Sequence, residues 1–444
     1  MHQTPPVAEH PRSALSRLRD TAQKAIPEAG IEAFERAVRA VLPDSVRPSE
    51  RRGQLGPMPE FEAMRSRMPQ VWKRNFTLRS VPVTAGLYVA YTSVRGLVKL
   101  GHLADDLLYP EWREHPIDRP VFMFANARSG TTLLHRLMAL DEDRFAPIKL
   151  YETIFPAASL NKFFDFVGTH DRSGIGRGIV DLLNRAFFGG WKDIHPMGLD
   201  KHEEDEATFC LSLHTTTLGL LFPEIDELED LFWFDKLPKH TRDEFLDFYE
   251  ASIKRHLYSA APDKRLLNKN VFYTPRVRSI YERFPDSIFI YMIRSPHESI
   301  GSYLDMFHRA WKVHRPDVDT DSRQARALAE MAIRQYRYAL ELRKVIPASQ
   351  FLVITYDEIT RDPGKTVRRI YRHLGMEPSP AFDARLREAT TNQRAWKSEH
   401  DYALEDFGIT ADWVYERLKD VYDEFGFAKP GSASDDAHRA GASA

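Results

Sequence analysis

The chain has 444 residues, a net charge of −2, 43% hydrophobic residues and 28% charged residues. This composition is typical of a globular protein with a large core, and the balanced charge excludes the basic footprint of a nucleic-acid binder. A single cysteine, Cys210, excludes a disulfide framework and a cysteine-based zinc site. No secretory signal and no apolar run long enough to span a bilayer can be identified, so we expect a cytoplasmic protein.

A helical extension is expected over residues 1–118. Apolar residues recur at helical spacing over 13–42 and again over 61–108, with a proline-rich stretch between them. The segment 81–103 is apolar but interrupted by two basic residues and a histidine. We expect it to be a packing helix, and the alternatives are an oligomer face or a peripheral contact with a membrane surface.

Strands and helices alternate over residues 119–430, which predicts an α/β domain around a mostly parallel sheet flanked by helices. A helical insert on the acceptor side is expected over about 155–260, and a disordered tail over 431–444. The expected strands are 120–125, one opening at 266–268, 287–293 and 351–355, and the expected helices include 133–140, 276–284, 321–346 and 367–374.

A phosphate-binding pattern follows the first of these strands. A polar turn leads directly into a helix, whose first N–H groups are unpaired and carry a partial positive charge. A glycine in the turn lets the backbone approach an anion, the hydroxyls add donors, and the arginine adds a fork suited to phosphate or sulfate. The predicted anion-binding residues are Arg128, Ser129, Gly130, Thr131 and Thr132.

This pattern differs from the Walker loop, because no lysine follows Gly130 and no glycine stands five residues before it. A nucleoside triphosphatase also needs an aspartate at a neighbouring strand end to hold Mg²⁺, whereas the strand 287–293 ends in Arg294. A phosphoryl-transferring kinase is therefore the disfavoured alternative. An ordinary strand–helix turn capped by Ser129 or Thr131 is the structural alternative.

A second anion site is predicted where the strand 287–293 ends. Arg294 stands at the strand end, Pro296 suits the first turn of a helix, and Ser302 follows two turns along. Arg294 and Ser302 can therefore reach one common anion. Two such sites in one open sheet favour a ligand at the carboxyl ends of its strands.

With these two elements the chain resembles the PAPS-dependent sulfotransferases, in particular their bacterial branch, over about residues 118–430. In that family the first element binds the 5′-phosphosulfate of the donor PAPS (phosphoadenosine phosphosulfate). The arginine and the serine of the second element bind its 3′-phosphate. The resemblance therefore implies a P-loop-like fold, a donor site at Arg128–Thr132 and a 3′-phosphate site at Arg294 and Ser302.

Further segments resemble the family in the same order. Residues 266–270 are similar to the segment before the second element, although its proline is absent, and 355–358 are similar to a strand end near the nucleotide. Residues 394–398 stand where relatives close over the 3′-phosphate, and 402–408 match a C-terminal signature. The resemblance implies further donor contacts by Lys269, Tyr356, Lys397 and Ser398.

Sulfuryl transfer to an alcohol needs a base near the acceptor oxygen and positive charge around the leaving phosphate. Glu152 stands where relatives carry a glutamate base, so the resemblance implies this role, for which its pKa would have to be raised by partial burial. The alternatives are a histidine base, and a Glu152 that forms a salt bridge to Arg128 and only shapes the loop.

Two further groups of residues have competing interpretations. His195 and His202, with the acids of 203–206, could suggest a metal cluster, but we expect a solvated acidic helix start, with a role at the acceptor mouth as the third alternative. The aromatic residues 232–234 could line an acceptor pocket, and core packing is favoured.

The resemblance therefore implies a sulfotransferase that moves a sulfuryl group from PAPS to a hydroxyl of a small-molecule, lipid or glycan acceptor, giving PAP and a sulfate ester. The expected partners are the nucleotide donor and the hydroxylated acceptor, with no nucleic acid and no metal. A homo-oligomer and a peripheral membrane contact stay open. The alternatives are a P-loop small-molecule kinase and an inactive interaction protein on the same fold.

Overall fold

The computed structural model describes residues 58–75, 80–126, 128–170, 178, 198–260, 263–393 and 404–432. The helix expected over 13–42, the tail over 433–444, and the predicted donor residues Lys397 and Ser398 lie outside the described residues.

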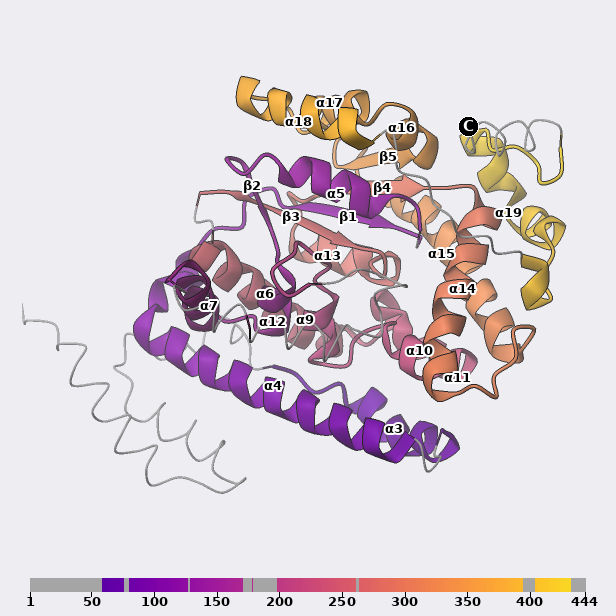
Figure 1. Cartoon of the computed structure of the whole chain (residues 1–444), viewed down its shortest axis with the longest axis horizontal. Coiled ribbons are helices and arrows are strands. Elements are labelled where there is room, and N and C mark those ends of the chain that lie inside the picture. Colours follow the sequence, from indigo (N-terminus) through magenta and orange to yellow (C-terminus); the bar gives the residue numbers. More distant parts are fainter. Residues whose placement is uncertain are drawn as a thin grey trace, which may run out of the picture.

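A sheet of five parallel strands forms the centre of the fold, in the order β2-β3-β1-β4-β5 (Figure 1). Every residue of β1 and β4 is buried, as their continuous apolar runs predict. The edge strand β2 was not predicted, because three residues are too short to show a pattern. The strands are β1 (Val121–Ala125), β2 (Phe145–Pro147), β3 (Arg265–Asn270), β4 (Ile288–Ile293) and β5 (Phe351–Thr355).

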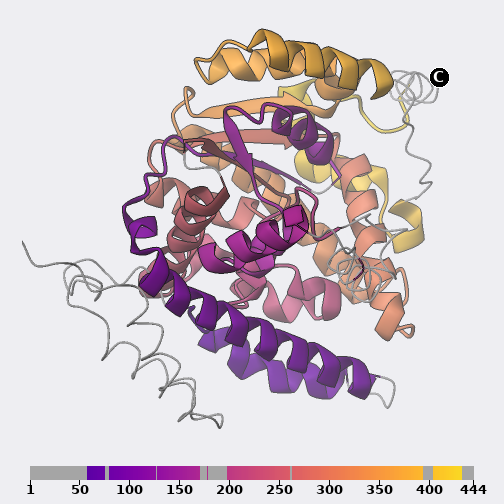
Figure 2. The same ribbon diagram turned by 60° about the vertical axis from the view of Figure 1, so that its left-hand side comes forward.

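Among the described residues, four helices cover one face of the sheet (Figures 1 and 2). Because side chains alternate between the faces along a strand, Val121, Met123 and Ile290 point towards these helices and share a core with them. The expected helices over 133–140 and 367–374 are confirmed and begin slightly earlier. The four are α5 (Thr131–Ala139), α16 (Tyr356–Arg361), α17 (Pro363–His373) and α18 (Pro380–Gln393).

The opposite face is aromatic and packs on the larger helical layer. Phe122 and Phe289 stack at 5.7 Å between ring centroids, and Phe124 and Tyr291 stack at 5.0 Å. The residues 232–234 are buried, and Phe232 and Phe234 belong to this core, so the predicted packing role is confirmed for these two. The layer contains α9 (Glu206–Cys210), α10 (Leu218–Leu221), α11 (Ile225–Phe232), η3 (Phe234–Lys236), α12 (Lys239–Ala260), η4 (Thr274–Arg276), α13 (Val277–Arg283), α14 (Pro296–His314), α15 (Arg323–Val345), η5 (Leu404–Phe407) and α19 (Ala411–Phe425).

The long helix α4 runs along the outside of this layer beside α3 (Figure 1). The carboxylate of Asp105 on α4 accepts hydrogen bonds from the first N–H groups of α7. It also forms an ion pair with Arg255 on α12 at 2.9 Å, so α4 is fixed to both helices. The helical stretch expected over 61–108 is present as two helices, α3 and α4. The bounds are α3 (Glu62–Arg74), α4 (Ser80–Leu108), η1 (Pro110–Glu114), α6 (Leu150–Ile154) and α7 (Ala158–His170).

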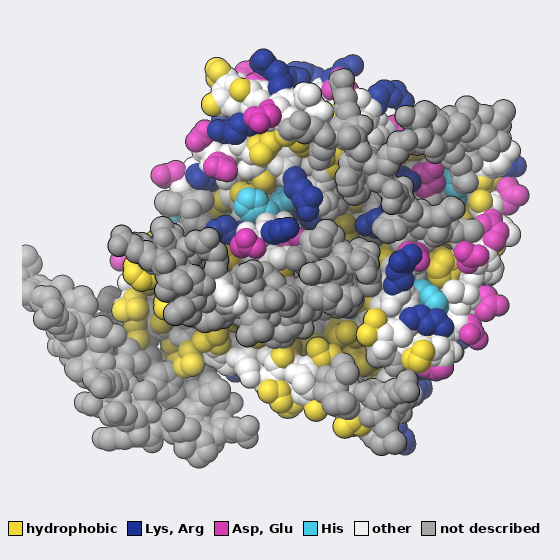
Figure 3. Space-filling model, viewed as in Figure 1, with side chains coloured by type: hydrophobic (Ala, Val, Ile, Leu, Met, Phe, Trp, Pro, Cys, Tyr) yellow, Lys and Arg dark blue, Asp and Glu magenta, His cyan; other side chains and the backbone are white. Residues whose placement is uncertain are grey.

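The outer side of α4 and α7 is apolar and exposed. Leu87, Tyr88 and Val89 on α4 have 48%, 68% and 61% of their surface exposed, and Phe163 and Phe166 on α7 have 58% and 60%. Hydrophobic side chains are accordingly visible along this side of the molecule (Figure 3). A scattered apolar residue on a surface needs no explanation, but a group of large ones is typical of an interaction surface.

Candidate active site

The turn between β1 and α5 has the backbone of an anion-binding loop. Arg128 and Gly130 both adopt left-handed conformations, with φ of 68° and 85°, and α5 begins at Thr131. The Ser129 hydroxyl donates to the Asn126 carbonyl at 2.8 Å, and both Ser129 and Thr131 are buried. The hydroxyl of Ser129 is therefore used inside the loop, and the N–H groups at the start of α5 are the donors suited to a ligand.

Gly130 is required by its conformation and by its surroundings. A Cβ atom at this position would lie 3.1 Å from the Tyr356 ring, and few residues other than glycine adopt its positive φ. Tyr356 begins α16, and the hydroxyl of Thr355 caps that helix by accepting a hydrogen bond from Glu358 N–H. The end of β5 is thus fixed against the loop that follows β1.

Arg294 joins the same place from the end of β4. Its guanidinium donates to the Arg128 carbonyl at 3.3 Å, pairs with Glu298 at 2.8 Å and lies 4.4 Å from the centroid of the Tyr356 ring. Arg128 in turn donates from Nε to the Ser302 hydroxyl at 3.2 Å. The two predicted anion elements therefore form one continuous cluster, because α14 begins at Pro296 as the sequence predicts.

Lys269 brings a third strand end to the cluster. Its side chain is 1% exposed, and Nζ lies 3.3 Å from the Thr132 hydroxyl and 3.1 Å from a Glu204 carboxylate oxygen. His135, on the same helix as Thr132, is buried nearby, and burial together with the positive charge of Lys269 lowers its pKa to about 3. His135 is therefore neutral, and the positive charge beside the loop belongs to Lys269.

Glu152 lies at the start of α6, after β2, and is 3% exposed. One carboxylate oxygen accepts the Lys149 N–H at 2.6 Å, and the other lies 3.3 Å from Nδ1 of His256. Burial raises the pKa of this carboxyl, but His256 and the Lys149 N–H lower it more, so the net pKa is below its usual value. The raised pKa that a base at this position would need is therefore not found. No ion pair joins Glu152 to Arg128 in the part of the chain that the structure describes.

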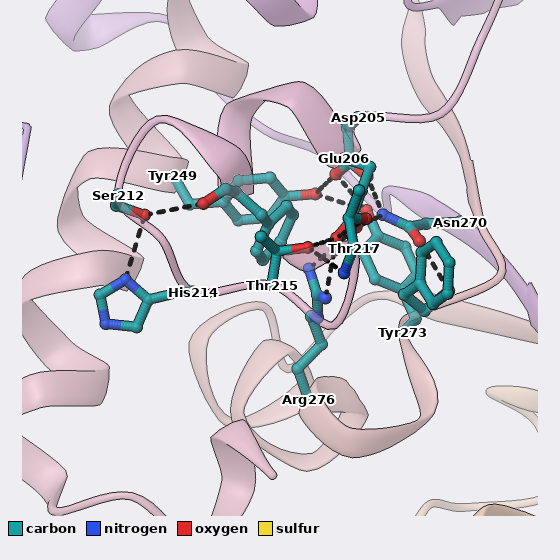
Figure 4. Close-up of polar contacts among 12 residues, drawn as sticks. Asp205, Glu206, Ser212, His214, Thr215, Thr217, Tyr249, Asn270, Tyr273 and Arg276 are labelled. Carbon is teal, nitrogen blue, oxygen red and sulfur yellow. Dashed lines mark hydrogen bonds and ion pairs between the residues drawn. The ribbon is translucent and has the colours of Figure 1, made fainter. Parts of the chain in front are cut away.

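The acidic segment around 200–206 is largely buried, so the expected solvated helix start is wrong. Asp205 is 1% exposed and accepts hydrogen bonds from the hydroxyls of Tyr249 and Tyr273 and from the side-chain amides of Asn268 and Asn270 (Figure 4). Burial raises its pKa to about 6, against the lowering effect of these bonds. Asp205 thus fastens the insert to β3.

Glu206 extends this network to the next helices. It pairs with Arg276 at 3.2 Å and accepts from the hydroxyls of Thr215 and Thr217 and from Asn270, the last at 2.6 Å (Figure 4). A buried polar network of this kind is stable only when its members are paired. Two asparagines within the buried strand 265–270 were the available sequence signal, since buried amides need partners.

The structure therefore brings together most of the residues predicted from the sequence. Arg128, Arg294, Ser302 and Tyr356 form one contact cluster, and Lys269 joins it through Thr132. Basic side chains gather beside histidines near the middle of the face shown in Figure 3. Glu152 lies outside these contacts. The predicted contacts of Lys397 and Ser398, and the histidine His195, lie outside the described residues.

Arginine, lysine and a helix N-terminus lie together at the strand ends of this parallel sheet. Such a site is typical of enzymes that bind nucleotides carrying phosphate or sulfate groups. The model of the sulfotransferase family matches residues 120–380, so the chain belongs to the sulfotransferase family. It is a PAPS-dependent sulfotransferase, which moves a sulfuryl group from PAPS to a hydroxyl. The expected fold and reaction are confirmed, and the kinase alternative is wrong.

Individual relatives agree with this assignment. The chain is 23% identical over 326 residues, or 70% of its length and 76% of the relative's, to the omega-hydroxy-beta-dihydromenaquinone-9 sulfotransferase Stf3 of Mycobacterium bovis. Its structure is similar to sulfotransferase STF9 from Mycobacterium avium, with a TM-score of 0.59 and 19% identity over 76% of this chain and 87% of that one. STF1 from Mycobacterium tuberculosis H37Rv gives a TM-score of 0.51 and 22% identity over 73% and 84%.

Within the described residues, no helix has the length and apolarity that crossing a membrane requires.

Proposed function

We propose that this sulfotransferase acts on a hydroxyl of a long, apolar acceptor, and that transfer takes place at the carboxyl edge of the sheet. The observation that supports the site best is the contact between the phosphate loop and cationic side chains from β3 and β4. These side chains come from strands distant in the sequence and meet only because the strands are parallel neighbours.

The cluster suits the donor at both of its charged ends. The N–H groups at the start of α5 suit an anion, and Arg128 and Lys269 supply positive charge for the phosphosulfate. Arg294 and Ser302 suit the 3′-phosphate, with the Tyr356 ring packed against the guanidinium. We propose that Ser129 and Thr131 contribute through their N–H groups, because both side chains are buried.

The reaction needs positive charge where the leaving phosphate develops negative charge. Arg128 and Lys269 are held in place before the donor arrives, so little reorganisation is needed during the reaction. In this proposal the charge of the leaving group is offset by protein side chains. Turnover is therefore expected to persist in the presence of EDTA.

Two observations support an apolar acceptor. The relative Stf3 is named for an omega-hydroxylated menaquinone, which is a hydroxyl-bearing prenylated molecule. The exposed apolar side of α4 and α7, with Leu87, Tyr88 and Phe163, gives this chain a surface that can contact lipid. We propose that this side makes peripheral contact with the membrane that carries the acceptor.

Donor binding is tested by thermal denaturation. PAP without Mg²⁺ is expected to stabilise the protein, by about 2.7 kcal/mol at a concentration one hundred times its Kd. Stabilisation by Mg·ATP but not by PAP would contradict the proposed donor site.

The acceptor class is tested by incubation with PAPS and matched alcohols, read by mass spectrometry. We expect sulfation of a long-chain prenyl alcohol and little sulfation of a glycan. Replacing Tyr88 by Ser is expected to raise KM for a vesicle-bound alcohol while PAP affinity stays unchanged. Preferred sulfation of the glycan would overturn the apolar acceptor.

A further inference from the structure

Two carboxylates lie near the ends of β2 and β3, and they differ in what they can reach. Glu152 has a 1% exposed side chain, of which one oxygen accepts the Lys149 N–H and the other is buried 3.3 Å from Nδ1 of His256. These contacts make Glu152 the cap of α6, a role that glutamate at this helix position commonly fills. Its side chain is 1% exposed, so a substrate hydroxyl has little access to it in this structure.

Glu204 is the carboxylate that contacts the donor cluster. It lies 3.1 Å from Nζ of Lys269, and this ammonium lies 3.3 Å from the hydroxyl of Thr132 in the phosphate loop. The side chain of Glu204 is 19% exposed, whereas that of Lys269 is 1% exposed. Glu204 is therefore separated from the phosphate loop by one ammonium group and is also open to solvent.

The backbone on both sides of Glu204 is fixed. On one side, the Glu203 N–H donates to the Ile148 carbonyl at 3.0 Å, and the Leu150 N–H donates to the Lys201 carbonyl at 2.9 Å. On the other side, Asp205 is held by the buried network of Figure 4. A catalytic group has to be held closely in position, and here the network provides that support.

We propose that Glu204, and not Glu152, is the general base of the sulfuryl transfer; this rests on the proposed donor site. The acceptor oxygen forms a bond to sulfur as the bond from sulfur to the bridging phosphate oxygen breaks. The bonding electron pair leaves with PAP, and the hydroxyl proton passes to a carboxylate oxygen of Glu204. The proton then passes to water, which the exposed part of the side chain can reach.

Lys269 couples this base to the donor. Without donor, its buried ammonium needs a counter-charge, and Glu204 supplies it. The sulfonate of PAPS brings a second negative charge to the same ammonium, and the hold of Lys269 on the carboxylate weakens. Donor binding therefore frees Glu204 to accept a proton, while Lys269, which stays in place, stabilises the group being transferred.

The test compares Glu204→Gln with Glu152→Gln in the full chain, with PAPS and a prenyl alcohol. Glu204→Gln is expected to lower kcat at least about 100-fold and to abolish the acidic limb of the kcat–pH profile, with the Kd for PAP within about threefold of wild type. Glu204→Asp is expected to restore part of kcat and the acidic limb. Glu152→Gln is expected to retain kcat within about tenfold, because glutamine also completes the cap.

Glu282→Gln is the matched control, because it removes a 3.3 Å ion pair to Arg242 on a side chain that is 57% exposed. Wild-type kcat in Glu204→Gln, or an acidic limb lost only in Glu152→Gln, would overturn the proposal. If the wild type does not sulfate the alcohol, the proposed acceptor class fails instead. The base is then decided by the same variants in the slower transfer of the sulfuryl group from PAPS to water.

Discussion

Charged residues have different surroundings at the strand ends of the donor side and in the helical insert of the acceptor side. At the ends of β1 and β4, the structure gathers positive charge, where Arg128 donates to the Ser302 hydroxyl and Arg294 pairs with Glu298. In the insert, Asp205 and Glu206 are buried and saturated with donors. A buried charge has to be paired, so the insert uses its acidic residues for structure, whereas the residues at the ends of β1 and β4 form the proposed donor site.

The largest effect is expected on the donor side. Arg128→Ala is expected to lower kcat/KM about 1000-fold, because it removes a charged donor from the developing negative charge. Steady-state kinetics with PAPS measure the loss. Arg136→Ala, an exposed arginine on the same helix, is the control and is expected to be neutral. Equal turnover by Arg128→Ala and wild type would contradict the proposed role of Arg128 in the donor site.

A structural loss is expected on the acceptor side. Asp205→Ala leaves two tyrosine hydroxyls and two amides without their acceptor, and about 3 kcal/mol of unfolding free energy is expected to be lost. Chemical denaturation measures this loss. The control Asp230→Ala removes an exposed ion pair and is expected to cost less than about 1 kcal/mol. Unchanged stability in Asp205→Ala would contradict the structural role of the network.

Two glycine substitutions distinguish the cost of backbone strain from a loss of donor binding. Gly130→Ala and Gly375→Ala both place a Cβ at positive φ, 85° and 68°, so each is expected to cost about 1–2 kcal/mol. Only Gly130 has a neighbour in the way, the Tyr356 ring at 3.1 Å. We therefore expect PAP affinity, measured by calorimetry, to fall in Gly130→Ala alone. Equal PAP affinity in both variants would show that the loop tolerates the Cβ.

The last effect is absent at neutral pH and is a change in the pH dependence of stability. Burial, assisted by the charge of Arg276, lowers the pKa of His214 to about 3, so the unfolded chain binds more protons below pH 6.5. Stability is therefore lost as the pH falls from 6.5 towards 3, by at most about 1.4 kcal/mol per pH unit for this group. His214→Phe, which keeps the ring packing with Phe61, is expected to reduce that slope in denaturation at several pH values. An unchanged slope would contradict this prediction.

The donor side could be predicted from the sequence because its anion site is built from local strand–helix turns. Arg128–Thr132 and Arg294 each lie within a few residues of the strand that positions them, and continuous apolar runs mark those strands. The acceptor side could not be predicted in this way. The hydroxyl partners of Asp205 lie 44 and 68 residues further along the chain, so its burial depends on packing that no local pattern encodes.

Glu152 shows the same limit at a single residue. Its place in the chain could be compared with a family pattern, but its surroundings depend on His256, more than a hundred residues later. The sequence therefore indicates where a carboxylate stands along the chain. Only the fold shows whether its oxygens are free or already used.

Tyr356 touches both anion elements, since its ring lies against Gly130 and beneath the guanidinium of Arg294. In the proposed donor site, the residues for the two ends of the nucleotide thus share one ring as a common support. For protein engineers who wish to change the nucleotide that the enzyme accepts, this makes the β1 turn, Arg294 and Tyr356 the smallest unit that can be exchanged between relatives. Transfer of the β1 turn alone would leave out the Tyr356 ring against which Gly130 packs.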